Sequence, residues 1–217
     1  LEAGFAAAGG ASVVADQQKL LRRAADMIHS PGMEAFDLQQ EPEGVRTTYG
    51  EGEFAAGCLM ARRLVERGVT FVEVSSRGWD THFDNFDRTR QLCQQVDQPT
   101  AALIADLRLR GLLERTLVVW MGEFGRTPRI NPRAGRDHYP RAFSVALAGG
   151  GVRGGQGIGR VERGGVEVAD RPVTVPDLFR TIYRALGVDA DQENVASNGR
   201  PIKVVDGGAP VDELFGA

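Results

Sequence analysis

Two short apolar runs, each placed directly behind a helical pattern, constrain the fold of this chain most. "VTFVEV" (69–74) follows a helical pattern over 52–67, and "TLVVWM" (116–121) follows another over 85–110. Runs of this length that are rich in β-branched residues are typical of buried strands. Helices that alternate with buried strands predict βαβ units, whose strands run parallel. The order of the patterns therefore predicts an α/β fold with a largely parallel sheet.

The remaining patterns extend this prediction. Apolar residues at helical spacing indicate helices over 16–29 and 175–186, and "RAFSVALAG" (141–149) is interpreted as a third strand. Thr174 and Asp177 have the spacing of a capping box at the start of the last helix.

Glycine and proline mark the expected helix ends. Glycine follows three of the helical patterns, at positions 68, 111 and 187, where a left-handed C-terminal cap is expected. Pro99 is expected to interrupt the helix over 85–110, because proline lacks the amide hydrogen that a helix interior uses. No linker divides the chain, so one domain over 1–217 is predicted, with a helical lead-in over 1–50 and a sheet core over 51–217.

Composition excludes several classes of protein. The chain has 217 residues, of which 42% are hydrophobic and 25% charged, as in ordinary globular domains. Its net charge is −3 and no basic stripe is visible, which argues against nucleic acid as a partner. No apolar run approaches the roughly 20 residues of a membrane-spanning helix. Cys58 and Cys93 match no metal or redox spacing and lie in helical patterns, which favours buried free thiols over the alternative of one disulfide.

Acidic residues and histidines gather behind the predicted strands. Asp80 and His82 follow the first strand, Glu123 follows the second, and Asp137 and His138 lie further on in "GRDHYP". In open α/β sheets, ligands bind beyond the carboxyl ends of the strands. Carboxylates neutralise a divalent cation, and neutral imidazole suits Zn, Mn or Fe. Each Asp–His pair alone also fits a capped turn with a surface imidazole, but their joint occurrence predicts a metal site.

Two arginines accompany the predicted ligands. Arg126 and Arg136 could bind a phosphate or sulfate oxyanion through bidentate hydrogen bonds, or they could pair with Glu123 and Asp137. No Gly-x-Ser-x-Gly elbow is present, so the sequence offers no Ser or Thr nucleophile.

Several motifs together resemble one family. "ARRLVERGVTFVEV", "GWDTH", "TLVVWMGEFGRTPRIN", "GRDHYP" and "PVTVPDLFRTIYRALGVD" are similar, in order and spacing, to the domain-of-unknown-function 1501 family, from about residue 33 to the C-terminus. The chain departs from the family at Tyr139, where Trp is common.

The family in turn resembles the alkaline phosphatase and sulfatase superfamily. This resemblance implies a partial three-layer sandwich that hydrolyses phosphate or sulfate esters with a divalent metal such as Zn, Mn or Ca. The implied metal ligands are Asp80, His82, Glu123, Asp137 and His138. Asp137 would serve either as a ligand or as the partner that orients a histidine, while Arg126 and Arg136 would bind the anionic ester substrate.

Members of the family are usually about twice as long as this chain. In the superfamily the N-terminal half supplies the first strands, an Asp ligand and the nucleophile. We therefore expect a C-terminal portion that is inactive alone and whose sheet is completed by the N-terminal half or by another chain. The alternative is a non-catalytic binding or scaffold protein that retains the fold. Many relatives carry export signals, although this chain shows none.

Overall fold

The computed structural model describes residues 10–216, which form two compact units with the boundary between Val74 and Ser75. The first unit is helical. It contains α2 (Ala11–Ile28), the 3-10 turns η2 (Pro31–Phe36) and η3 (Leu38–Gln40), α3 (Glu43–Tyr49) and α4 (Glu53–Glu66). α4 packs against η2, η3 and α3. The core of this unit includes Ala35, Tyr49, Ala55, Cys58 and Leu59.

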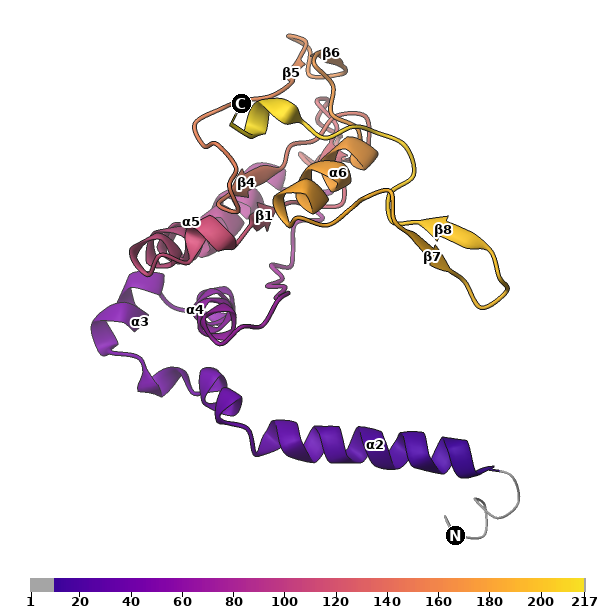
Figure 1. Cartoon of the computed structure of the whole chain (residues 1–217). Helices are drawn as coiled ribbons and strands as arrows, with labels where there is room; N and C mark the ends of the chain where they lie inside the picture. The colour runs from indigo at the N-terminus through magenta and orange to yellow at the C-terminus, as the bar shows by residue number, and fades with distance from the viewer. Residues whose placement is uncertain (1–9, 217) are drawn as a thin grey trace. The chain divides into compact units, whose positions relative to one another are not determined.

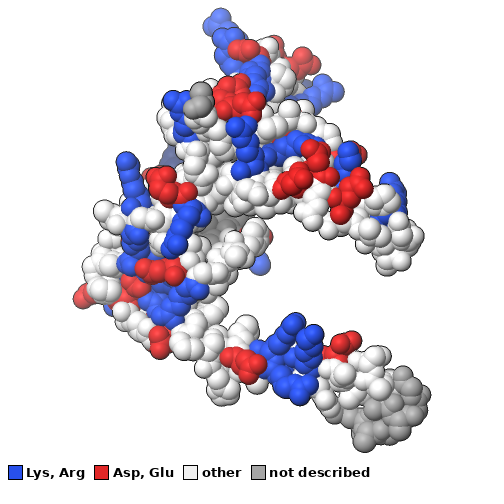
Figure 2. Space-filling model, viewed as in Figure 1, with Lys and Arg blue, Asp and Glu red and all other residues white. Residues whose placement is uncertain are grey.

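The helix predicted over 16–29 is present as α2, a straight rod in Figure 1. None of its described side chains is buried, and most of its large apolar residues are exposed, namely Val13, Leu20, Leu21, Met27 and Ile28. In Figure 2 a band of basic side chains crosses this helix between acidic ones, and both signs of charge are interspersed over the rest of the face shown.

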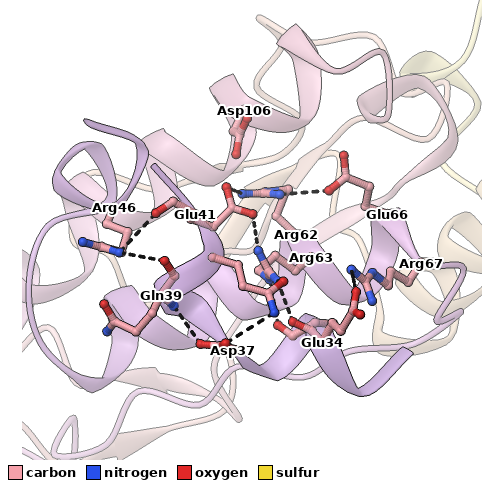
Figure 3. Close-up of polar contacts among 12 residues, drawn as sticks. Glu34, Asp37, Gln39, Glu41, Arg46, Arg62, Arg63, Glu66, Arg67 and Asp106 are labelled. Atoms are coloured by element: carbon pink, nitrogen blue, oxygen red, sulfur yellow. Dashed lines mark hydrogen bonds and ion pairs between the residues drawn. The ribbon is translucent and has the colours of Figure 1, made fainter. Parts of the chain in front are cut away.

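A buried ion-pair cluster joins η2 and η3 to α4 (Figure 3). The Glu41 carboxylate lies 2.7 Å from Nη2 of Arg62 and also accepts a hydrogen bond from Arg63. The two arginines are only 1% and 6% exposed. Arg63 also donates through Nε to the carbonyl of Ala35 at 2.8 Å. The cluster therefore fixes the loop before α3 onto the face of α4.

Acid is expected to weaken this cluster. The hydrogen bond from Arg62 lowers the pKa of Glu41, and the bond from Arg63 lowers it further against the opposing effect of burial. A carboxyl whose folded-state pKa is depressed stabilises the fold above its unfolded pKa and loses that contribution as pH falls through the folded value. The stability difference between wild type and Glu41→Gln should therefore be full at pH 6 and shrink below about pH 4.5. Urea unfolding of both proteins at several pH values measures it; a pH-independent difference would contradict the assignment.

The first predicted strand, over residues 69–74, is absent from the structure. α4 ends as predicted at Gly68, where φ is 85°; the Gly68 amide donates to Val65 and the Val69 amide to Leu64. The segment that follows carries no strand, and Phe71 is 81% exposed. From Phe71 to Ser76 the residues still alternate between exposed and half-buried, as in a strand, whereas Val69 and Thr70 are both exposed. A strand also needs a β-ladder with a neighbouring strand, and no ladder among the described residues includes this segment.

The second unit combines two long helices with short strands. Its helical elements are α5 (Asn85–Leu109), η4 (Leu113–Arg115), α6 (Val175–Ala185) and η5 (Asp212–Leu214). Its strands are β1 (Val118–Trp120), β2 (Gly125–Arg126), β3 (His138–Tyr139), β4 (Ala146–Ala148), β5 (Arg160–Val161), β6 (Val168–Asp170), β7 (Glu193–Val195) and β8 (Pro201–Lys203). They pair as β1–β4, β2–β3, β5–β6 and β7–β8, and the last pair forms the long hairpin that projects beyond α6 in Figure 1.

The predicted parallel sheet and three-layer sandwich are wrong. Every sheet among the described residues has two strands, and each pair is antiparallel. The predicted strands 116–121 and 141–149 are present in part as β1 and β4, with Val118 opposite Ala148. A parallel pair needs a crossover connection, usually a helix, whereas the chain between β1 and β4 returns through the β2–β3 pair. The apolar pattern predicted the presence of these strands but not their direction.

The long helices refine two further predictions. α5 continues through Pro99, so the predicted interruption is wrong; this proline is buried, and the Thr100 hydroxyl donates to the Val96 carbonyl at 2.6 Å in the same turn. The predicted capping box of α6 is confirmed, with Thr174 and Asp177 bonding each other's backbone amides. Both cysteines are free thiols as predicted; Cys58 is buried, whereas Cys93 is exposed, which corrects the prediction that both are buried. Among the described helices, none is sufficiently long and apolar to span a membrane.

Candidate metal centre

Three of the predicted ligands converge in the second unit. Nε2 of His138 lies 2.9 Å from Oδ1 of Asp80, and Nε2 of His82 lies 3.1 Å from both of these atoms. Asp80 and His82 come from the loop before α5, and His138 comes from β3, 56 residues after His82. The three side chains are partly exposed, so the cluster is open to solvent.

Backbone hydrogen bonds hold the two ligand-bearing segments together. The amide of Arg136 donates to the Thr81 carbonyl at 3.1 Å, and the amides of Asp84 and Asn85 donate to residues 133 and 134. Gly135 lies against the backbone of His82 and Phe83 so closely that a Cβ atom would overlap it. The backbone therefore sets the distances among the side-chain atoms of Asp80, His82 and His138. Position 135, where the two segments come closest, requires glycine.

The β2–β3 register places Arg126 beside the cluster. Arg126 pairs directly opposite His138, and its Nη1 lies 2.8 Å from Oδ1 of Asp80. The ring of Phe124 packs against His138, with centroids 4.4 Å apart. One carboxylate oxygen thus faces two imidazoles and one guanidinium.

Asp137 lies on the far side of His82. Its Oδ1 is 2.9 Å from Nδ1 of His82 and accepts a second hydrogen bond, at 3.1 Å, from the side-chain amide of Asn131. Thr127 fixes its backbone, since the Thr127 amide donates to the Asp137 carbonyl at 2.9 Å. Of the two roles considered for Asp137, this geometry is that of the partner that orients a histidine.

Hydrogen bonds lower the pKa of both carboxylates. The hydrogen bond from His138, followed by that from Arg126, lowers the pKa of Asp80 to about 2. The hydrogen bond from His82, followed by that from Asn131, lowers the pKa of Asp137. Both groups are therefore anionic at neutral pH, which is the form that attracts a cation or holds an imidazole proton.

The other predicted site residues lie elsewhere. Glu123 is exposed and lies outside the Asp80–His82–His138 cluster. Nη1 of Arg136 donates to the carbonyls of Thr127 at 2.5 Å and Pro128 at 2.7 Å, so this arginine braces the turn after β2. A separate groove of about 630 Å³ lies between α5 and the β1–β4 pair, and none of the predicted ligands lines it.

Sequence reasoning missed Asn131, Phe124 and Thr127. Asn131 had a readable signal, because the Asn-Pro pair in "RINPRAG" is typical of a turn closed by the asparagine side chain. The packing of Phe124 and the role of Thr127 depend on the β2–β3 register, for which no local pattern exists in the sequence.

Comparisons with known proteins give one match. No curated protein and no solved structure matches the chain. A family model matches residues 1–215, nearly the whole chain. The chain therefore belongs to the family described as "Protein of unknown function (DUF1501)".

Proposed function

We propose that Asp80, His82 and His138 bind a divalent transition metal. The observation that carries this proposal is the mutual separation of their three donor atoms, 2.9–3.1 Å. A metal about 2.0–2.1 Å from each ligand places neighbouring ligand atoms roughly 2.8–3.0 Å apart in octahedral and roughly 3.3–3.4 Å apart in tetrahedral coordination, and the observed separations lie close to these ranges. Nε2 of both imidazoles faces Oδ1 of Asp80, and two rings that each donated to this oxygen would bring their N–H groups against each other. A shared cation accounts better for the arrangement.

The donor set indicates the class of metal. Two imidazoles with one carboxylate suit Zn, Mn or Fe, whereas Ca prefers a shell of six to eight oxygens. Three protein ligands leave at least one position for water or substrate, as in catalytic rather than structural zinc sites. We therefore favour Zn or Mn over Ca at this centre.

The proposed reaction is hydrolysis of a phosphate or sulfate ester. A bound metal supplies an activated water and polarises an oxygen of the ester. Arg126 lies at the edge of the cluster, and its planar guanidinium is suited to binding an oxyanion. The likeness of the family to alkaline phosphatases and sulfatases supports this chemistry, and the proposal does not require the sheet of those enzymes. Arg136 donates into the turn after β2, whereas Arg126 reaches Asp80 in the cluster, so the proposal depends on Arg126.

Metal content of purified variants tests the proposed centre. We expect about one equivalent of Zn or Mn in the wild-type chain and a loss of at least tenfold in Asp80→Ala and in His138→Ala. His29→Ala is the matched control, since His29 is exposed and lies outside the cluster, and it should retain the metal. Unchanged metal content in Asp80→Ala would remove that residue from the site.

Activity measurements then separate the enzyme from a scaffold protein. The metal-loaded full-length protein is assayed against phosphate and sulfate monoesters, with Arg126→Ala alongside. Metal-dependent turnover that Arg126→Ala weakens through a higher KM supports the hydrolase. Stoichiometric metal without turnover of any ester would support the alternative, a binding or scaffold protein that keeps the metal for stability.

A further inference from the structure

We propose that Asn131 is a positioning residue that holds Asp137 on His82 and thereby keeps Nε2 of His82 unprotonated and available to a metal. The inference rests on the proposed metal centre for its purpose. The claim that Asn131 controls which nitrogen of His82 carries the proton is supported by the hydrogen bonds of Asn131 alone.

All the hydrogen-bonding capacity of the Asn131 side chain converges on this region. Its Nδ2 donates to Oδ1 of Asp137 and to the carbonyl of His82, each at 3.1 Å. Its Oδ1 accepts from the amides of Arg133 at 2.9 Å and Gly135 at 3.0 Å. An amide side chain has two N–H donors and one oxygen with two lone pairs, so all four positions are filled. The side chain thus has two separable functions, closing its own turn through oxygen and orienting the site through nitrogen.

Two carboxylates compete for the single proton of neutral His82. Asp137 faces Nδ1 at 2.9 Å, and Asp80 faces Nε2 at 3.1 Å. A proton on Nδ1 leaves Nε2 free for a metal, whereas a proton on Nε2 blocks it. Oδ1 of Asp80 is already shared between Arg126 and His138, and Asp137 is held in place by Asn131. The contacts therefore favour the Nδ1–H tautomer as long as Asn131 keeps Asp137 aligned.

The first test is the tautomer of His82 in the metal-free full chain, read from the ¹⁵N shifts of its ring by NMR at a pH where the ring is neutral. We expect Nδ1–H in the wild type and a substantial Nε2–H fraction in Asn131→Ala. Asn131→Asp separates the two functions, because it retains an oxygen for the Arg133 and Gly135 amides but lacks the donor to Asp137. This variant should shift the tautomer as Asn131→Ala does, and a purely structural asparagine would leave it as in the wild type.

The second test is the affinity for Zn²⁺ by competition with a chromogenic chelator. Loss of an outer partner of a metal-binding histidine typically weakens binding 10–100-fold, and we expect this range for both Asn131 variants. The negative charge added in Asn131→Asp would by itself attract a cation, so weaker binding by that variant cannot arise from charge alone. Asn198→Ala is the matched control, because Asn198 also caps a turn, through the Arg200 amide at 3.1 Å, and lies away from the cluster.

The outcomes distinguish this inference from the proposed function. An unchanged His82 tautomer in both variants would overturn the role of Asn131, whether or not the chain binds Zn²⁺. Unchanged Zn²⁺ affinity in both variants would overturn it as well. A wild-type chain that binds no Zn²⁺ but shows the expected tautomer shift would sustain the positioning of His82 by Asn131 and refute the zinc centre alone.

Discussion

Replacing Glu41 by glutamine is expected to destabilise the first unit by about 3–5 kcal/mol, the cost of removing one partner from a buried ion pair. The substitution preserves the shape of the side chain and removes its charge. Arg62 and Arg63, 1% and 6% exposed, would then lose the carboxylate that lies between them. Arg62 would keep its ion pair with Glu66 at 2.9 Å, and Arg63 would keep its hydrogen bonds to backbone carbonyls, so two neighbouring cations would share one carboxylate in a site with little access to water. The penalty comes from these buried cations far more than from the lost pair itself.

Hydrogen exchange of the α4 amides, together with urea unfolding followed by circular dichroism, measures this effect. Glu51→Gln is the matched control, because Glu51 is an exposed residue of the same unit and its loss should change stability by less than about 0.5 kcal/mol. A loss below about 1 kcal/mol in Glu41→Gln would mean that water or other groups solvate the two arginines and that the cluster is not the main support of the loop before α3.

The features that could be predicted from the sequence are those determined within one turn of the chain. The glycines at 68, 111 and 187 end helices as predicted, each with positive φ and with the amide after it bonded to the final turn. Thr174 and Asp177 form their capping box for the same local reason. The direction of β1 and β4, and the absence of a β-ladder at residues 69–74 in the described part of the chain, depend on contacts between distant segments, which a hydrophobic pattern does not encode.

The candidate site shows the same division. Asp80, His82 and His138 could be predicted as ligands from residue type alone, and the structure brings them together. Glu123 was grouped with them on the assumption of a parallel sheet, whose strand ends would meet at one edge. The antiparallel β2–β3 register instead places Arg126 opposite His138. The site is therefore built from two loops tied by backbone hydrogen bonds, an arrangement that becomes visible only once the register is known.

Replacing Gly135 by alanine is expected to abolish metal binding and to destabilise the second unit by more than the roughly 1–3 kcal/mol typical of overpacking. The added Cβ would overlap the backbone of His82 and Phe83, which cannot move aside as a flexible side chain could. The two segments would have to separate, and the amide bond from Arg136 to Thr81 would lengthen with them. Since Asp80 and His82 lie on one segment and His138 on the other, the three donor atoms could no longer stay 2.9–3.1 Å apart.

Zn²⁺ affinity and thermal unfolding of Gly135→Ala, measured beside Gly154→Ala, test this expectation. A Cβ added at Gly154 would meet no atom within 4 Å, and φ there is not positive, so alanine at this position should be almost neutral. Wild-type affinity in Gly135→Ala would show that the metal site does not depend on the close approach of the two loops. Lost affinity with a native-like melting temperature would show that the two loops separate locally while the rest of the unit stays folded. The contact at Gly135 would then be needed for the metal site but not for the stability of the unit.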